Sequence, residues 1–213
     1  FIREQQVSSV QYAAQIKTSA AKGKNIATYP TGNSLADQLK IVARLIQGGL
    51  QTKVYYVNLG GFDTHANQVE LTDTTTGEHA DLMADISMAV KSFQDDLKAM
   101  SIEDKVIGMT FSEFGRRAIS NGSRGTDHGL AAPLFVFGTG VKTQMVGTNP
   151  NLKDLDGNNL KMQHDFRQVY AAILEDWFGS NAATETAVLF KDYQSVPVFR
   201  QTITAVEPTF TAK

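Results

Sequence analysis

A chain of 213 residues with 42% hydrophobic and 20% charged side chains suits one soluble domain and has enough apolar residues to bury a core. Its formal net charge of -2 at pH 7 provides no basic field for a nucleic-acid partner, and its lack of cysteine excludes disulfide scaffolds, thiolate zinc sites and a cysteine nucleophile. The sequence contains no apolar run near the roughly 20 residues that span a bilayer.

Two helices are expected in the first quarter of the chain. Apolar residues recur at helical spacing through 2–22, and Gly23 is a suitable stop. The second helix follows the turn sequence TYPTGNS, with Asn33 or Ser34 as its N-cap, and it ends at the glycine pair 48–49. Its predicted inner face consists of Leu35, Leu39, Val42, Ala43 and Ile46.

Three buried strands are expected next. KVYYVNLGG, residues 53–61, is β-branched and aromatic and is apolar on both faces, which is typical of a buried parallel strand. A polar loop over 62–76 leads to a helix predicted from residue 78 to 100, and further strands are predicted at 105–111 and 133–138. The order predicts a right-handed crossover and an α/β fold with a mainly parallel sheet flanked by helices.

The last part of the sequence is less regular. Residues 146–162 predict a short hairpin, 165–178 predict a helix that ends at Gly179, and an extended piece is expected at 200–206.

We therefore expect one α/β domain over 1–213. It would consist of a helical leader at 1–50, a core at 53–179 and an irregular tail at 180–213. The chain begins at Phe1 and enters a helical pattern at once, so we expect it to be the carboxyl-terminal portion of a longer precursor with any export signal upstream.

Unusual polar residues follow or precede the predicted strands. Asp63 and His65 come after the first strand, Glu113 follows the second, and Asp127 and His128 precede the third. Ligand sites in open parallel sheets form at the carboxyl ends of strands, so we expect these side chains to converge. Carboxylate oxygen and imidazole nitrogen suit zinc, manganese or iron, and an oxygen-rich site also holds calcium or magnesium. A divalent metal ion is the predicted cofactor.

Two arginines close to Glu113 suggest what such a metal would act on. A guanidinium fork fits phosphate or sulfate oxygens bidentately, and Arg116 is the preferred candidate for this role over Arg117. Arg117 is the better candidate for a solvated or salt-bridged residue. A metal ion that polarises the ester or activates water would complete the site. The predicted chemistry is transfer or hydrolysis at an anionic ester, carried by a small molecule or a polymer.

Each motif also has a structural interpretation. The triplet DTH is often only a turn in which Asp caps a local N–H, and a Glu after a strand is often solvated. His79 suits a capping or surface role and His164 a structural one. DLDGN, residues 154–158, resembles a calcium loop but lacks its twelfth-position Glu, which favours a hairpin turn. Ser112 lacks the G-x-S-x-G surroundings of a serine nucleophile.

The sequence resembles a bacterial family of unknown function, domain-of-unknown-function family fifteen-oh-one. The likeness covers about 53 to 179, and its FDTH, SEFGR and DHG blocks are specific in combination. Members are commonly predicted to carry twin-arginine export signals, which implies a periplasmic or extracellular location. The runs that carry the resemblance are YYVNLGGFDTHANQ, FSEFGRR, GTDHGLAAPLFVFGTGVKTQMVG and DFRQVYAAILEDWFG.

That family is similar in turn to the alkaline phosphatase and sulfatase superfamily. The similarity implies metal-dependent hydrolysis of phosphate or sulfate esters and a fold equivalent to the carboxyl-terminal part of such a domain. His128 matches a ligand histidine before an apolar strand, with Asp127 as a further ligand or as its orienting partner. Glu113 and Phe114 stand where the superfamily has an Asp-His pair. Asp63 matches an aspartate whose usual histidine partner is replaced here by asparagine.

These departures favour a second hypothesis. The superfamily's nucleophile and first metal aspartate lie near the amino terminus of the domain, in a segment that this sequence does not contain. An exported binding or surface-assembly protein that kept the fold and lost the chemistry would show the same departures. Clustered FDTH and TDHG favour the enzyme, and metal content distinguishes the two hypotheses.

Overall fold

The computed structural model describes residues 2–200. The chain divides into two compact units. Unit 1 runs to Lys105 and includes the short segment Asn121–Gly125, and unit 2 comprises Val106–Ser120 and the chain from Thr126 onward. The extended piece expected at 200–206 lies outside the described residues except for Arg200.

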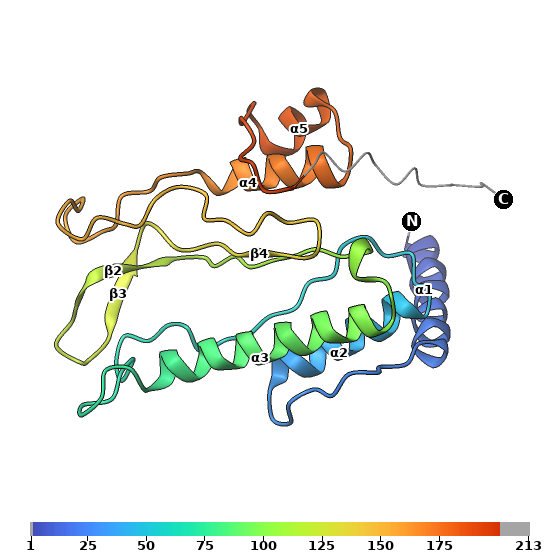
Figure 1. Ribbon diagram of the computed structural model, residues 1–213. Coiled ribbons are helices and arrows are strands. Elements are labelled where there is room, and N and C mark those ends of the chain that lie inside the picture. The colour runs from blue at the N-terminus through green and yellow to red at the C-terminus, as the bar shows by residue number, and fades with distance from the viewer. Residues whose placement is uncertain (1, 201–213) are drawn as a thin grey trace. The chain divides into compact units, whose positions relative to one another are not determined.

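Unit 1 is built from three helices: α1 (Ile2–Lys22), α2 (Ser34–Gln47) and α3 (Glu78–Ala99). All three were predicted from the sequence, and α2 and α3 lie side by side in Figure 1. The N-cap of α2 is Asn33, whose side-chain oxygen accepts a hydrogen bond from Ala36 N at 2.9 Å. The buried apolar side chains of the two packed helices are Leu35, Ala36, Leu39, Ala43, Leu45, Ala89, Phe93 and Leu97.

Two glycines allow α1 and α2 to approach closely. A Cβ on Gly48 would lie 1.9 Å from the carbonyl oxygen of Ser19, and a Cβ on Gly23 would lie 1.9 Å from that of Arg44. The expected stops of both helices are therefore also contact points. At these positions the absence of a side chain is required by packing.

A buried carboxylate ties the segment between α1 and α2 to α3. Asp96 is fully buried, and its oxygens accept hydrogen bonds from Asn25 Nδ2 at 2.7 Å, Ile26 N at 2.6 Å, Ala27 N at 2.9 Å and the Tyr29 hydroxyl at 2.9 Å. Burial raises the pKa of the Asp96 carboxyl, but these hydrogen bonds outweigh it and leave the pKa below its ordinary value. Burial and the hydrogen bond to Asp96 raise the pKa of Tyr29.

The prediction of a strand over residues 53–61 is wrong, because this segment pairs with no strand in the part of the chain that the structure describes. Its side chains alternate, with Tyr55 half-buried while Val54 and Tyr56 are 72% and 73% exposed. Only one face is covered, whereas a buried parallel strand is covered on both. The side chain of Gln38 binds the backbone here, because its Nε2 donates to Asn58 O at 2.8 Å and its Oε1 accepts from Asn58 N at 3.1 Å.

Unit 2 contains two short antiparallel pairs. Strand β1 (Gly108–Met109) pairs with β4 (Val136–Phe137), and β2 (Gly115–Ser120) pairs with β3 (Thr126–Gly129). The predicted mainly parallel sheet flanked by helices, of alkaline phosphatase and sulfatase type, is therefore wrong for the residues described. Parallel neighbours need a crossover, usually a helix, but the chain between β1 and β4 forms a hairpin and returns antiparallel.

The last described elements are helical. The predicted helix forms as α4 (Phe166–Ala172), which continues as a π-helical turn (Ile173–Trp177), and a further helix, α5 (Ala182–Leu189), was not predicted. A single 3₁₀ turn, Glu103–Lys105, follows α3. The core of this part of unit 2 is formed by Ala172, Val196, Val198 and Phe199, with Trp177 and other half-buried side chains around it.

An ion pair anchors the start of α4. Asp165 accepts from Arg167 N at 2.9 Å and Arg167 NH2 at 2.6 Å, and Gln168 completes a capping box. Hydrogen bonding from Arg167 lowers the pKa of Asp165 to about 2. Because this pKa is depressed, the carboxylate stabilises the fold above the ordinary pKa of Asp, and that stabilisation is lost as pH falls toward 2.

We expect Asp165→Ala to lower the free energy of unfolding by about 1–2 kcal/mol at pH 7, because both the cap and the partly exposed ion pair are lost. Asp165→Asn keeps an acceptor for the backbone and should cost less. Urea unfolding between pH 7 and roughly pH 2 checks both values. A wild-type acid dependence that persists unchanged in Asp165→Asn would assign it to other carboxyl groups.

Candidate metal-binding loop

Asp63 and His65 form a contact pair in unit 1. Asp63 Oδ1 lies 3.1 Å from His65 Nε2, and the two side chains are 59% and 48% exposed. His65 N also donates to Asp63 O at 3.0 Å, which folds the DTH triplet into a tight turn. The DTH triplet therefore forms a turn, and the same turn brings its two ligand-type side chains into contact. A carboxylate oxygen and an imidazole nitrogen face each other at the surface, where a cation can reach both.

The loop that carries this pair is held at several points within unit 1. Thr64 is buried between the two and its hydroxyl donates to Gln68 Oε1 at 3.1 Å. His79 N donates to Gln68 O at 3.2 Å, and the His79 ring meets Phe62 edge-on at 6.2 Å. His79, in the first turn of α3, therefore contacts the loop through both its backbone N–H and its ring.

The second support of the loop is the turn Asn121–Gly125. Asn121 Nδ2 donates to His65 O at 2.7 Å, and Asn67 N donates to Ser123 O at 3.1 Å. A Cβ on Gly125 would lie 2.3 Å from the carbonyl oxygen of His65, so the turn can approach this closely only with glycine there.

The remaining predicted site residues lie in unit 2, and the hairpin β2–β3 arranges most of them. His128 is opposite Arg116 in the register and stacks on Phe114, with ring centroids 3.8 Å apart and planes 8° from parallel. The Arg116 guanidinium lies 5.0 Å from the centroid of the same Phe114 ring, and its NH1 donates to Thr126 O at 2.7 Å. Arg116 therefore takes part in the structure of the hairpin.

The two other predicted residues of unit 2 have different surroundings. Arg117 NH1 lies 3.6 Å from Asp127 Oδ2, as expected for a salt-bridged residue, and both side chains are partly exposed at 42% and 47%. Glu113 lies in a bend two residues before the start of β2 and is exposed. The Asp127 carboxylate thus has a cationic neighbour, whereas the Glu113 side chain faces solvent.

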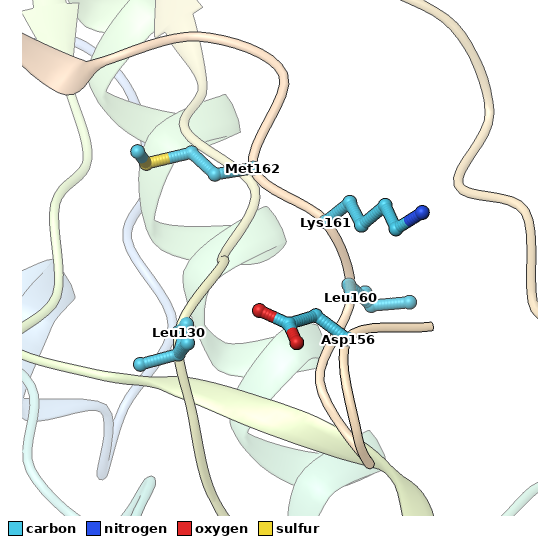
Figure 2. A pocket seen from close by; sticks show the side chains of 5 residues that line it. All are labelled: Leu130, Asp156, Leu160, Lys161 and Met162. Atoms are coloured by element: carbon cyan, nitrogen blue, oxygen red, sulfur yellow. The ribbon is translucent and has the colours of Figure 1, made fainter. Parts of the chain in front are cut away.

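The DLDGN segment forms a hairpin turn, as predicted. Asp156 and Asn159 exchange backbone hydrogen bonds, both at 3.0 Å, and Gly157 has a positive φ of 58° at the first central position of the turn. Nearby lies an open hollow of about 610 Å³ (Figure 2). In the view shown, Asp156 points toward Leu130 and the Lys161 ammonium points away. The hollow is lined by Leu130, Asp156, Leu160, Lys161 and Met162.

Comparison with protein families identifies the group to which the chain belongs. The model of a family described as "Protein of unknown function (DUF1501)" matches residues 5–182. The chain belongs to the DUF1501 family. The match covers the paired Asp63–His65 loop and the whole β2–β3 hairpin. Comparisons of this DUF1501 chain with curated proteins and with solved structures found no match.

None of the helices described in residues 2–200 of this DUF1501 chain has the length and apolarity required to cross a membrane.

Sequence reasoning missed the residues that support the loop. Asn121 and Gly122 form the Asn-Gly pair that marks a hairpin turn, and this signal was present in the sequence. The prediction of an open loop between two parallel strands left no role for it. The Phe114 ring, on which His128 stacks, has no comparable local signal because the contact depends on the hairpin register.

Proposed function

We propose that this DUF1501 chain is part of a metal-dependent hydrolase of phosphate or sulfate esters, related to the alkaline phosphatase and sulfatase superfamily. The observation that carries the proposal is the contact of Asp63 Oδ1 with His65 Nε2 at 3.1 Å on a loop braced from two sides. Oxygen and nitrogen donors in one turn suit zinc or manganese better than calcium.

The proposal assigns roles to the other predicted residues as well. Glu113, Asp127 and His128 would complete the ligand set, an assignment that rests on the sequence pattern and the resemblance. When bound, the metal would act as a Lewis acid on an anionic ester or lower the pKa of a bound water. Arg116 would hold the substrate anion. The chain would be the carboxyl-terminal portion of an exported protein that acts in the periplasm or outside the cell.

A second candidate function is supported by the surroundings of Arg116. Its guanidinium already donates to Thr126 O and lies over Phe114, and Phe114 stacks on His128 where the superfamily carries a second ligand. An exported binding or surface-assembly protein that lost the chemistry would tolerate this use of its polar groups.

Metal binding by the full 213-residue chain, without an affinity tag, separates the two functions. We expect the protein to bind Zn²⁺ or Mn²⁺ stoichiometrically in calorimetric titration. His65→Ala should weaken binding by more than the roughly tenfold to hundredfold that changes outside the ligand set cost. His164→Ala, which removes another exposed histidine, is the matched control and should bind as the unsubstituted chain does.

A chain that binds neither ion, and whose stability is unchanged by a chelator, would remove the enzyme hypothesis. If metal binds, a panel of phosphate and sulfate esters assayed with the longer precursor then tests the reaction. Metal binding without turnover of any ester in that panel would favour the binding protein.

A further inference from the structure

We propose that Asn121 is a positioning residue for the metal ligands, acting from the turn Asn121–Gly125 on the backbone of His65. The inference rests on the proposed function, because it concerns the loop that carries Asp63 and His65. It adds a residue that lies 56 positions from His65 in the sequence and that the ligand pattern does not include.

The Asn121 carboxamide uses its two ends for different tasks. Its Oδ1 accepts from Ser123 N at 2.8 Å and from Gly125 N at 3.1 Å, which fixes the shape of its own turn. Its Nδ2 donates to His65 O at 2.7 Å. A backbone bond from Asn121 N to Gly125 O at 2.8 Å closes the turn behind it. The side chain therefore joins a rigid turn to the peptide of a proposed ligand.

Two neighbouring contacts also hold the turn Asn121–Gly125 against the loop that carries His65. Asn67 N donates to Ser123 O at 3.1 Å, and the Arg124 guanidinium donates to Asn67 Oδ1. Asn67 has a positive φ of 53°, a conformation that asparagine tolerates better than most residues. The loop is thus held on both sides of Ala66, at the peptide of His65 and at Asn67.

This arrangement matters because both ligand-type side chains are about half exposed. At the surface, packing does little to limit the rotation of the imidazole and carboxylate, so their separation depends on the backbone that carries them. Fixing the His65 carbonyl fixes the peptide plane next to the imidazole. Ligand orientation by such supporting groups typically changes metal affinity by about 10–100-fold.

The test compares two asparagines whose side-chain oxygens each accept from the backbone N–H two residues later. Asn121→Ser keeps a side-chain oxygen for its turn and loses the amide donor to His65 O. Asn151→Ser makes the same uncharged change at an exposed turn of unit 2, where Asn151 Oδ1 accepts from Lys153 N at 3.0 Å. Calorimetric titration of each full-length variant with Zn²⁺, together with the melting temperature of the metal-free protein, gives affinity and stability separately.

We expect Asn121→Ser to weaken Zn²⁺ binding about tenfold or more, with a melting temperature within the range of Asn151→Ser, which should bind as the unsubstituted chain does. Asn67→Gly is a second variant, because glycine accepts the positive φ and the backbone bond to Ser123 O remains. It loses only the Arg124 contact, so it should weaken binding in the same direction by a smaller factor.

The inference is overturned if the unsubstituted chain binds Zn²⁺ and Asn121→Ser binds it equally well, a result that leaves the proposed function standing. It is also overturned if Asn121→Ser and Asn151→Ser weaken binding alike, because the effect would then be a general one of turn stability. A chain that binds no Zn²⁺ at all removes the proposed function and this inference together, and that outcome is recognised before any variant is made.

Discussion

Asp96→Ala is expected to lower the free energy of unfolding by about 3–5 kcal/mol. The substitution removes the fully buried carboxylate that accepts hydrogen bonds from four donors and leaves those donors without their acceptor. Two of those donors are backbone N–H groups, which cannot turn to solvent unless the segment that precedes Tyr29 moves away from α3. Urea unfolding at pH 7 followed by circular dichroism measures the loss.

The adjacent residue provides the control. Asp95 is 54% exposed and pairs with Lys91 one helical turn away. Asp95→Ala removes the same type of side chain from the same helix and should lower the free energy of unfolding by only about 0.5 kcal/mol. Equal losses in the two variants would mean that the Asp96 hydrogen bonds contribute little net stability.

The protonation of Asp96 gives the same site a pH signature. Its pKa lies below the ordinary value in the folded state, so its contribution is complete above the unfolded pKa of about 3.9 and is lost as pH falls through the lowered folded value. The unsubstituted protein should lose stability over that acid range more steeply than Asp96→Ala.

Gly48→Ala is expected to cost about 3 kcal/mol, because the new methyl group would lie 1.9 Å from the Ser19 carbonyl oxygen. The φ of Gly48 is -73°, which any residue adopts, so the cost arises from the approach of α1 alone. The obstructing atom belongs to a helix backbone and cannot rotate away. Relief requires α1 to shift relative to α2.

Gly49 distinguishes close approach from backbone conformation. It has a positive φ of 83° and a Cβ there would meet nothing within 4 Å, so Gly49→Ala should cost only the left-handed strain of about 1 kcal/mol. The pair is compared by denaturant unfolding. If Gly49→Ala proves the more costly, conformation rather than contact governs this helix end.

The helices of unit 1 were predictable because their signals are local. Asn33 caps α2 through its own side chain, and the glycines that end α1 and α2 act within one turn of the helix. The sheet was not predictable by the same means, because strand direction depends on what the intervening chain does. The residues between β1 and β4 were predicted to be a loop. The Asn-Gly pair within them instead lies in the turn of the β2–β3 hairpin, and β4 then runs antiparallel to β1.

The candidate site divides in the same way. Asp63 and His65 are two residues apart and meet through a turn that the sequence contains. Arg117 and Asp127 meet only because the hairpin places them on neighbouring strands, and neither residue type indicates that pairing in advance. α5 was missed because its apolar residues lack helical periodicity, although Asn181 provides a recognisable N-cap.

The Gln38 carboxamide has a consequence for the behaviour of the chain in concentrated solution. By occupying both the N–H and the C=O of Asn58, it acts as a one-residue substitute for a neighbouring strand beside a β-branched, aromatic segment. Exposed backbone of that composition otherwise recruits other molecules into intermolecular ribbons. We therefore expect this side chain from α2 to reduce strand-like pairing with other molecules at Asn58.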